Sequence, residues 1–138
     1  PVQNYHLTIA FLGAMSVATV PDVAAAARGI RFAPFELVLQ QGGYWQRSCT
    51  AWLAPVSCPQ ALAALVDDLS NKLTDLGLAL DSQQFRPPVT LARNAGAAAG
   101  VQLATPVRWR VQSFVLLEST PGAAGPVYTV LEEFPAAQ

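Results

Sequence analysis

Residues 4–13 read NYHLTIAFLG, and much later in the chain residues 85–93 read FRPPVTLAR. The first stretch alternates polar and apolar residues, which predicts a strand. Residues two apart on a strand share a face, so we expect His6 and Thr8 to line one surface together. The second stretch predicts a short strand with Thr90 at the position equivalent to Thr8. The fold therefore depends on how these two similar strands are brought together.

Side chains of this kind suit a phosphate site. An imidazole such as that of His6 gains or loses a proton near neutral pH, and a threonine hydroxyl hydrogen-bonds a phosphate oxygen. Alone, His6 and Thr8 are more typical of a satisfied structural pair. The repetition of the pattern around Thr90 favours a shared function. Cross-strand packing of the two β-branched threonines remains the alternative.

The rest of the pattern predicts an α+β protein. Helices and strands are interleaved without strict βαβ alternation, which favours an antiparallel or mixed sheet arrangement. We see no interior linker and expect residues 1–138 to form a single domain. The sequence predicts helices over Pro21–Gly29 and Pro59–Leu76, strands over Tyr5–Leu12, Arg31–Gln40, Cys49–Ala54, Val89–Arg93, Trp109–Glu118 and Val127–Phe134, and a turn at Gln41–Gly43. The apolar positions expected to face the core include Leu7, Ile9, Phe11, Val89, Leu91 and the helical stripe Leu62, Leu65, Val66, Leu69, Leu73 and Leu76.

Composition excludes several classes of protein. The 138 residues are 52% hydrophobic and 12% charged, which fits a globular core and not a disordered chain. No apolar run reaches the roughly 18 residues of a membrane span. A net charge of −1 with scattered arginines argues against broad duplex binding. Cys49, Cys58 and the single histidine do not make a convincing zinc site, and we expect both cysteines to be reduced, in or near the core, in a cytoplasmic protein.

The two opening stretches resemble the two signatures of the 2H phosphoesterases, most closely the RNA 2′,3′-cyclic phosphodiesterases once called 2′-5′ RNA ligases. The similarity continues through PFELVLQ, TAWLAP, the long helix and the terminal WRVQSFVLLES and GPVYTVLEEFP. The resemblance implies a bilobal fold of two antiparallel sheets with flanking helices around a central groove, to which each lobe contributes one His-x-Thr strand. Family members normally have a strand and a helix ahead of the first signature, and we expect both to be missing here.

The resemblance also implies a reaction and roles. The family opens a nucleoside 2′,3′-cyclic phosphate to leave a 2′-phosphate, on RNA ends or small cyclic nucleotides, without a metal or other cofactor. Carried over by position, His6 is one of two proton-transfer groups, Thr8 and Thr90 are phosphate-binding hydroxyls, and Arg93 is the cationic contact. A surface salt bridge is the alternative for Arg93. We expect a monomer.

Pro88 departs from the family pattern, because it stands where the second histidine belongs. Proline has neither a titratable group nor a backbone N–H, so it can neither move a proton nor donate to a phosphate. Removing one acid–base group typically costs about 10²–10⁴ in rate. We expect a phosphate-binding groove with reduced phosphodiesterase activity. The alternative is a non-catalytic binder of RNA terminal phosphates or nucleotides.

Further arginine and aromatic residues leave alternatives open. Arg86 is either a second phosphate contact or, as we favour, a structural or solvent-facing residue. Tyr44 and Trp45 follow a Gly-Gly pair, so they form either an exposed rim on which a base stacks or part of the packing around a turn. Trp52 and Trp109 lie in apolar strands and are expected in the core.

Overall fold

The computed structural model describes residues 2–80, 85, 87–96 and 102–138. Apart from two 3₁₀ turns, at Val2–Asn4 and Val17–Thr19, the regular elements are two α-helices and six strands in these residues. The helices are α1 (Val20–Arg28) and α2 (Gln60–Asp75), and the strands are β1 (Phe35–Trp45), β2 (Thr50–Ala54), β3 (Val89–Arg93), β4 (Gln102–Val111), β5 (Ser113–Thr120) and β6 (Val127–Pro135).

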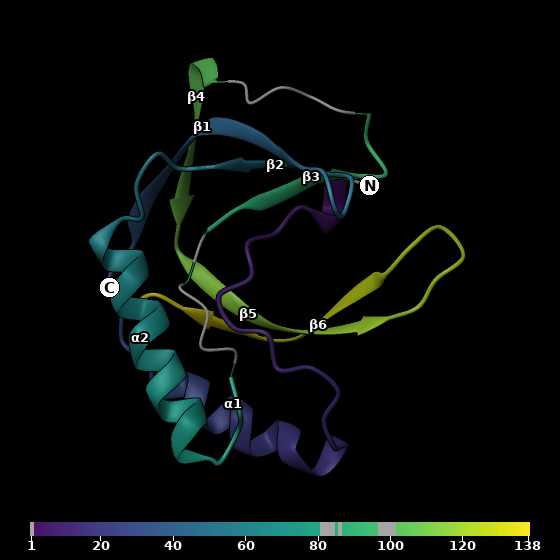
Figure 1. Cartoon of the computed structure of the whole chain (residues 1–138). Helices are drawn as coiled ribbons and strands as arrows, with labels where there is room; N and C mark the ends of the chain where they lie inside the picture. The colour runs from purple at the N-terminus through teal and green to yellow at the C-terminus, as the bar shows by residue number, and fades with distance from the viewer. Residues whose placement is uncertain (1, 81–84, 86, 97–101) are drawn as a thin grey trace.

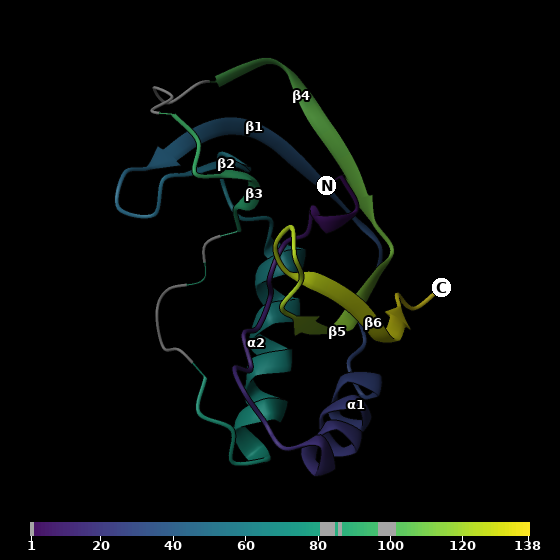
Figure 2. The ribbon, with the colours of Figure 1, turned by 90° about the vertical axis from the view of Figure 1, so that its right-hand side faces the viewer.

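The strands form two antiparallel sheets, as the family resemblance implied. The four-stranded sheet has the order β3-β2-β1-β4, and the two-stranded sheet is the hairpin β5-β6. Figure 1 shows the first sheet above the second, with α1 below the hairpin and α2 running along one side of the molecule. The N-terminal segment runs between the two sheets before it reaches α1, and Figure 2 shows the same course from the side.

Helix α2 follows its predicted stripe closely. The leucines and the valine of this stripe up to Leu73 are buried, because this face of the helix packs against core residues of both sheets. Gly77 ends it with a φ of +81°, a conformation that favours glycine. The last residue of the predicted stripe, Leu76, is not buried: it lies at the end of the helix and is 43% exposed.

Two hydrophobic clusters share α2. The sheet–helix cluster joins the four-stranded sheet to the N-terminal half of α2, and the helix–helix cluster joins α1, the C-terminal half of α2 and the hairpin β5-β6. The buried residues of the sheet–helix cluster are Leu37, Leu39, Leu53, Leu62, Val66 and Val89. Those of the helix–helix cluster are Val23, Ala24, Ala27, Ile30, Phe32, Leu65, Leu69, Leu73 and Phe134.

The structure corrects one turn prediction and one strand prediction within the sheets. The expected turn at Gln41–Gly43 is part of β1, which begins later than predicted and continues to Trp45. The expected strand Trp109–Glu118 is the end of β4 and most of β5, separated at Gln112, where the chain leaves one sheet for the other. Alternation of apolar residues continues across this break, so the pattern does not reveal it.

Several burial predictions were also wrong. Trp109 is 39% exposed instead of buried, and Trp52 is only half-buried. Leu91 is 40% exposed because the pairing of β2 with β3 is irregular at that point, which leaves Leu91 without a partner in the register. Cys49 and Cys58 are free thiols at exposed positions and not part of the core.

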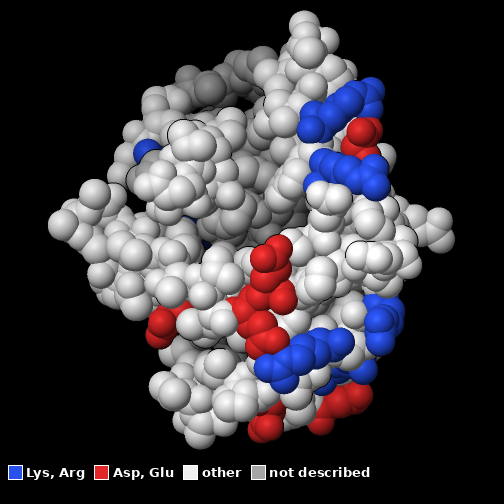
Figure 3. Space-filling view, turned by 180° about the vertical axis from the view of Figure 1, so that it is seen from behind, with Lys and Arg blue, Asp and Glu red and all other residues white. Residues whose placement is uncertain are grey.

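Charged side chains are spread over the surface. Figure 3 shows acidic and basic residues interleaved across the back of the molecule and not gathered into one basic stripe. Arg28 at the end of α1 reaches Glu132 on β6 through two contacts, from Nε to Oε1 at 2.6 Å and from Nη2 to Oε2 at 2.8 Å. This hydrogen-bonded pairing with the guanidinium lowers the pKa of the Glu132 carboxyl below its usual value. Among the helices of the described residues, none has the length and apolar character that crossing a bilayer requires.

Candidate active site

The segment that carries His6 and Thr8 is extended but is not a strand. Within Tyr5–Leu12 only Leu7 pairs with another strand, in an isolated antiparallel bridge to Val89 on β3, so the strand prediction was wrong. Leu7 packs against the sheet–helix cluster, whereas Ala10 and Leu12 pack against the helix–helix cluster. Because the segment crosses from one cluster to the other, it cannot stay paired with β3.

This crossing also explains the exposure of the next apolar residues. Ile9 contacts both clusters, at the point where the segment bends. Phe11 was expected to face the core with Leu7 and Ile9, but it is 77% exposed. The alternation rule fails at Phe11 because it requires a regular strand.

The bridge between Leu7 and Val89 brings the two signature stretches together. In an antiparallel register around this bridge, His6 lies opposite Thr90 and Thr8 lies opposite Pro88. Leu7 and Val89 both point into the sheet–helix cluster. Since neighbouring residues of an extended segment alternate in direction, the residues on either side of the bridge face away from this cluster, on a common side: His6 and Thr8 on one stretch, Pro88 and Thr90 on the other.

The imidazole of His6 is held from two sides. Its Nδ1 lies 2.7 Å from the backbone carbonyl oxygen of Asn4. A carbonyl oxygen can only accept, so Nδ1 donates and the neutral ring keeps the lone pair on Nε2. The ring of Tyr128 on β6 contacts the imidazole edge-on, with 4.8 Å between centroids and 62° between planes. Asn4 Nδ2 in turn donates to the carbonyl oxygen of Pro126, at 3.2 Å, which ties the same segment to the hairpin.

A large open cleft lies beside this imidazole. Its volume is about 990 Å³, and its lining includes three of the four predicted site residues, His6, Thr8 and Arg93. The fourth, Thr90, is half-buried on β3 and is not part of that lining. Tyr128 lines the cleft from the opposite sheet. The cleft therefore collects an imidazole and a hydroxyl from the first signature stretch and a guanidinium from the second.

The positions of the remaining predicted residues follow from β3. Arg93 is exposed at the last position of this strand and pairs with Thr50 of β2. Pro88 is half-buried just before the strand. Arg86 lies outside the described residues, so its two interpretations stay open. Within the described ranges, no group of three or more His, Cys, Asp or Glu side chains is placed to hold a metal ion.

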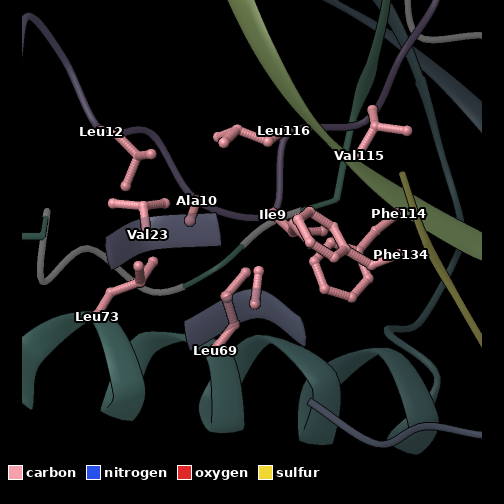
Figure 4. A pocket seen from close by; sticks show the side chains of 11 residues that line it. Ile9, Ala10, Leu12, Val23, Leu69, Leu73, Phe114, Val115, Leu116 and Phe134 are labelled. Carbon is pink, nitrogen blue, oxygen red and sulfur yellow. The ribbon is translucent and has the colours of Figure 1, made fainter. Parts of the chain in front are cut away.

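A second, much smaller cavity of about 50 Å³ lies in the helix–helix cluster. Figure 4 shows Leu69 and Leu73 of α2 facing Phe114 and Phe134 of the hairpin across it. All of its lining side chains are hydrophobic, so it is a packing void and offers no group for proton transfer or phosphate binding.

Tyr128 is the site residue that sequence reasoning missed. It contacts His6 directly, yet it lies on the last strand, far from the first signature in the sequence. The only local signal is its place in a strand after a Gly/Pro-rich connection, and such a signal does not distinguish a site residue from a packing residue.

Comparisons with known proteins agree with this geometry. The sequence profile of the 2′-5′ RNA ligase superfamily matches residues 3–123. The Escherichia coli K12 protein named RNA 2′,3′-cyclic phosphodiesterase is 33% identical over 99 residues, which are 72% of this chain and 56% of that protein. The Thermus thermophilus protein of the same name is 32% identical over 145 residues, which cover 97% of this chain and 73% of that protein.

The fold is shared with solved structures as well. The crystal structure of E. coli LigT complexed with 3′-AMP matches with a TM-score of 0.89 and 29% identity, covering 100% of this chain and 80% of that one. Two antiparallel sheets, flanking helices and a cleft at the bridged signatures therefore define a fold of the LigT type. The chain belongs to the 2′-5′ RNA ligase superfamily. Its match spans little more than half the length of the E. coli relative.

Proposed function

We propose that this chain is an RNA 2′,3′-cyclic phosphodiesterase that opens a terminal cyclic phosphate to a 2′-phosphate, at a rate reduced by Pro88. The geometry of His6 carries the proposal. Its Nδ1 is fixed on the Asn4 carbonyl oxygen, which leaves Nε2 to take a proton. The cleft that it lines also contains Thr8 and Arg93, whose hydroxyl and guanidinium suit a phosphate.

The reaction needs two proton movements. The oxygen of a water molecule bonds to phosphorus, its proton passes to Nε2 of His6, and the bond from phosphorus to the 3′-oxygen breaks. Hydroxyls of Thr8 and Thr90 donate to the nonbridging oxygens, while Arg93 stabilises their growing negative charge. In a site with two imidazoles, the second one protonates the leaving 3′-oxygen.

Pro88 removes that second proton donor. Its ring has no proton to give, so the departing 3′-oxygen must take its proton from solvent. The expected loss is about 10²–10⁴ in rate relative to a two-histidine site, since that is the usual contribution of one general acid. The phosphate contacts do not depend on this group, so binding is retained.

A second function follows from the same substitution. In a binding module the cleft captures a 2′- or 3′-phosphorylated RNA end without turnover, and Pro88 is the observation that favours it. E. coli LigT, which shares the fold, has been crystallised with 3′-AMP. This supports a nucleotide-sized ligand for either function.

One paired experiment separates the two functions. Adenosine 2′-monophosphate is titrated into the chain while hydrolysis of adenosine 2′,3′-cyclic monophosphate is measured at high enzyme concentration. Binding together with slow turnover that disappears in His6→Ala supports the phosphodiesterase. Binding with no turnover in either protein supports the module, and a chain that does neither contradicts both. Retained binding of inorganic phosphate by His6→Ala checks that the cleft is intact.

We further propose that residues 1–138 act as one domain and as a monomer, on RNA ends or small cyclic nucleotides in the cytoplasm. The exposed, unpaired thiols of Cys49 and Cys58 support a reducing compartment. Light scattering on a size-exclusion column tests the monomer, and a mass twice that of the chain would contradict it.

A further inference from the structure

One face of the four-stranded sheet carries two tryptophans beside the proposed phosphate contacts. Trp52 on β2 lies opposite Gly43 of β1 on one side and opposite Thr90 of β3 on the other. Residues directly opposed in an antiparallel pair project from the same face. Trp52 and Thr90 therefore share a face, and the next pair, Leu53 and Val89, points the other way into the sheet–helix cluster.

A second row of the sheet extends this face. Thr50 lies two residues from Trp52 and therefore projects from the same side of β2. It is opposite Trp45 on β1 and opposite Arg93 on β3. The face that carries Thr90 and Arg93 at one edge thus carries Trp45 and Trp52 further in. Trp45 and Arg93 stand two strand spacings apart, roughly 9.5 Å between backbones, which a ribose with its base can span.

The two indoles form a fixed aromatic surface. Their ring centroids are 5.7 Å apart, with 37° between planes. The Trp52 ring lies directly over Gly43, since a Cβ added there would overlap Trp52 Cζ2. Trp45 packs against the Trp52 indole and is itself 43% exposed, so part of its ring is open to solvent.

A hydrogen bond holds this surface in place relative to β3. Tyr44 precedes Trp45 in the chain. Its hydroxyl donates to the carbonyl oxygen of Ala95 at 2.8 Å. Ala95 is two residues beyond Arg93, so the bond links the strand of the exposed indole to the segment that carries the guanidinium. A surface fixed in this way loses little conformational freedom when a flat ligand stacks on it.

We propose that Trp45, supported from behind by Trp52, stacks on the nucleobase of the nucleotide whose phosphate is bound at Thr90 and Arg93. This inference rests on the proposed function and adds a base subsite to it. Every nucleobase has a π-face, so such a subsite accepts all four bases and adds affinity without reading sequence. The net charge of −1 is consistent with a ligand held by one phosphate and one stacked base, and not by a long backbone.

The test compares a ligand with a base to one without. Adenosine 2′-monophosphate and inorganic phosphate are titrated into the wild-type chain, Trp45→Leu, Trp45→Phe and the neighbouring control Gln46→Ala. Loss of one stacking partner weakens binding by about five- to hundredfold. We expect that loss for the nucleotide alone in Trp45→Leu, and near wild-type binding of both ligands in Trp45→Phe and Gln46→Ala.

The outcomes separate this inference from the proposed function. If the wild type binds phosphate and the nucleotide while Trp45→Leu leaves the nucleotide affinity unchanged, the base subsite is wrong and the phosphate site stands. The subsite is equally wrong if Trp45→Leu weakens phosphate and nucleotide together, because the substitution then disturbs the whole site. A wild-type chain that binds neither ligand overturns both proposals.

Discussion

Leu7 and Val89 form an antiparallel bridge, and this single pairing places the two signature stretches side by side. Its register sets His6 opposite Thr90 and Thr8 opposite Pro88. The two tripeptides are thus related by a local twofold axis through the bridge. Under this symmetry Thr8 corresponds to Thr90, whereas His6 corresponds to Pro88. The chemistry departs from the symmetry at that one position, where an imidazole in the first stretch is replaced by a pyrrolidine ring in the second.

Restoring the second imidazole should restore the rate. We expect Pro88→His to raise hydrolysis of adenosine 2′,3′-cyclic monophosphate by about 10²–10⁴, because the leaving oxygen regains a proton donor. Pro88→Ala is the matched control, since it removes the proline ring without adding an acid. Initial rates under identical conditions check the prediction. Equal rates for the two variants would mean that the missing imidazole does not limit this chain.

The tautomer of the His6 imidazole can be measured by NMR. It is the only histidine in 138 residues, so its ring nitrogens give unambiguous signals in a ¹⁵N–¹H NMR spectrum. We expect the neutral ring to carry its proton on Nδ1, because the Asn4 carbonyl oxygen at 2.7 Å can only accept. A neutral ring protonated on Nε2 would rule out His6 as the base described above.

Tyr128 should act as a positioning residue for that ring. An edge-on aromatic contact is worth about 0.5–1.5 kcal/mol, so we expect Tyr128→Leu to lower kcat about two- to tenfold with little change in KM. Tyr128→Phe keeps the ring and should retain both the rate and the His6 NMR signals of the wild type. A loss of the same size in Tyr128→Phe would assign the effect to the hydroxyl and not to the ring contact.

The sequence predicts a structural feature well when that feature depends on residues close together in the chain. The apolar stripe of α2 was predictable because helical periodicity is visible in residues three and four apart. The burial of Val89 was predictable from strand alternation, which is also a local pattern. The break between β4 and β5 at Gln112 was not predictable, since apolar and polar side chains alternate in the same way on both sides of it. The contact of Tyr128 with His6 joins the two ends of the chain, and no local pattern encodes it.

The same limit applies to the functional residues. The resemblance predicted roles for His6, Thr8, Thr90 and Arg93, of which all but Thr90 line one cleft. It did not anticipate that the Tyr5–Leu12 segment would be bridged at only one residue, because that depends on how the segment passes between two clusters. Trp52 was expected in the core because its strand is apolar, although its face of the sheet is set by the register with β3.

The ion pair between Arg28 and Glu132 should make the thermal stability of the folded chain depend on pH in the acid range. The pKa of Glu132 is lowered from about 4.5 in the folded chain, chiefly by the hydrogen bond from Arg28. A group with a depressed folded pKa contributes stability above its unfolded pKa and loses it as pH falls through the folded value. We expect Glu132→Gln to melt slightly below the wild type at pH 7, and the difference to vanish below the folded pKa.

The effect should be modest because both side chains are partly exposed and screened by solvent. Asp68→Asn, at an exposed position on α2, is the control for loss of a carboxylate without loss of this pair. Melting temperatures across the acid range and at two salt concentrations check the prediction. A difference that persists unchanged at low pH or in high salt would show that Glu132 acts through packing and not through its charge.

Gly43 should be intolerant of any side chain. A Cβ at this position would overlap Trp52 Cζ2, so Gly43→Ala must displace the indole or the strand. Overpacking of this kind typically costs about 1–3 kcal/mol of unfolding free energy. Gly96→Ala is the matched control, because a Cβ there has no atom of the described residues within 4 Å. Urea unfolding followed by tryptophan fluorescence measures both the stability and the environment of the indole, and a Gly43→Ala protein as stable as Gly96→Ala would contradict the packing of Trp52 over β1.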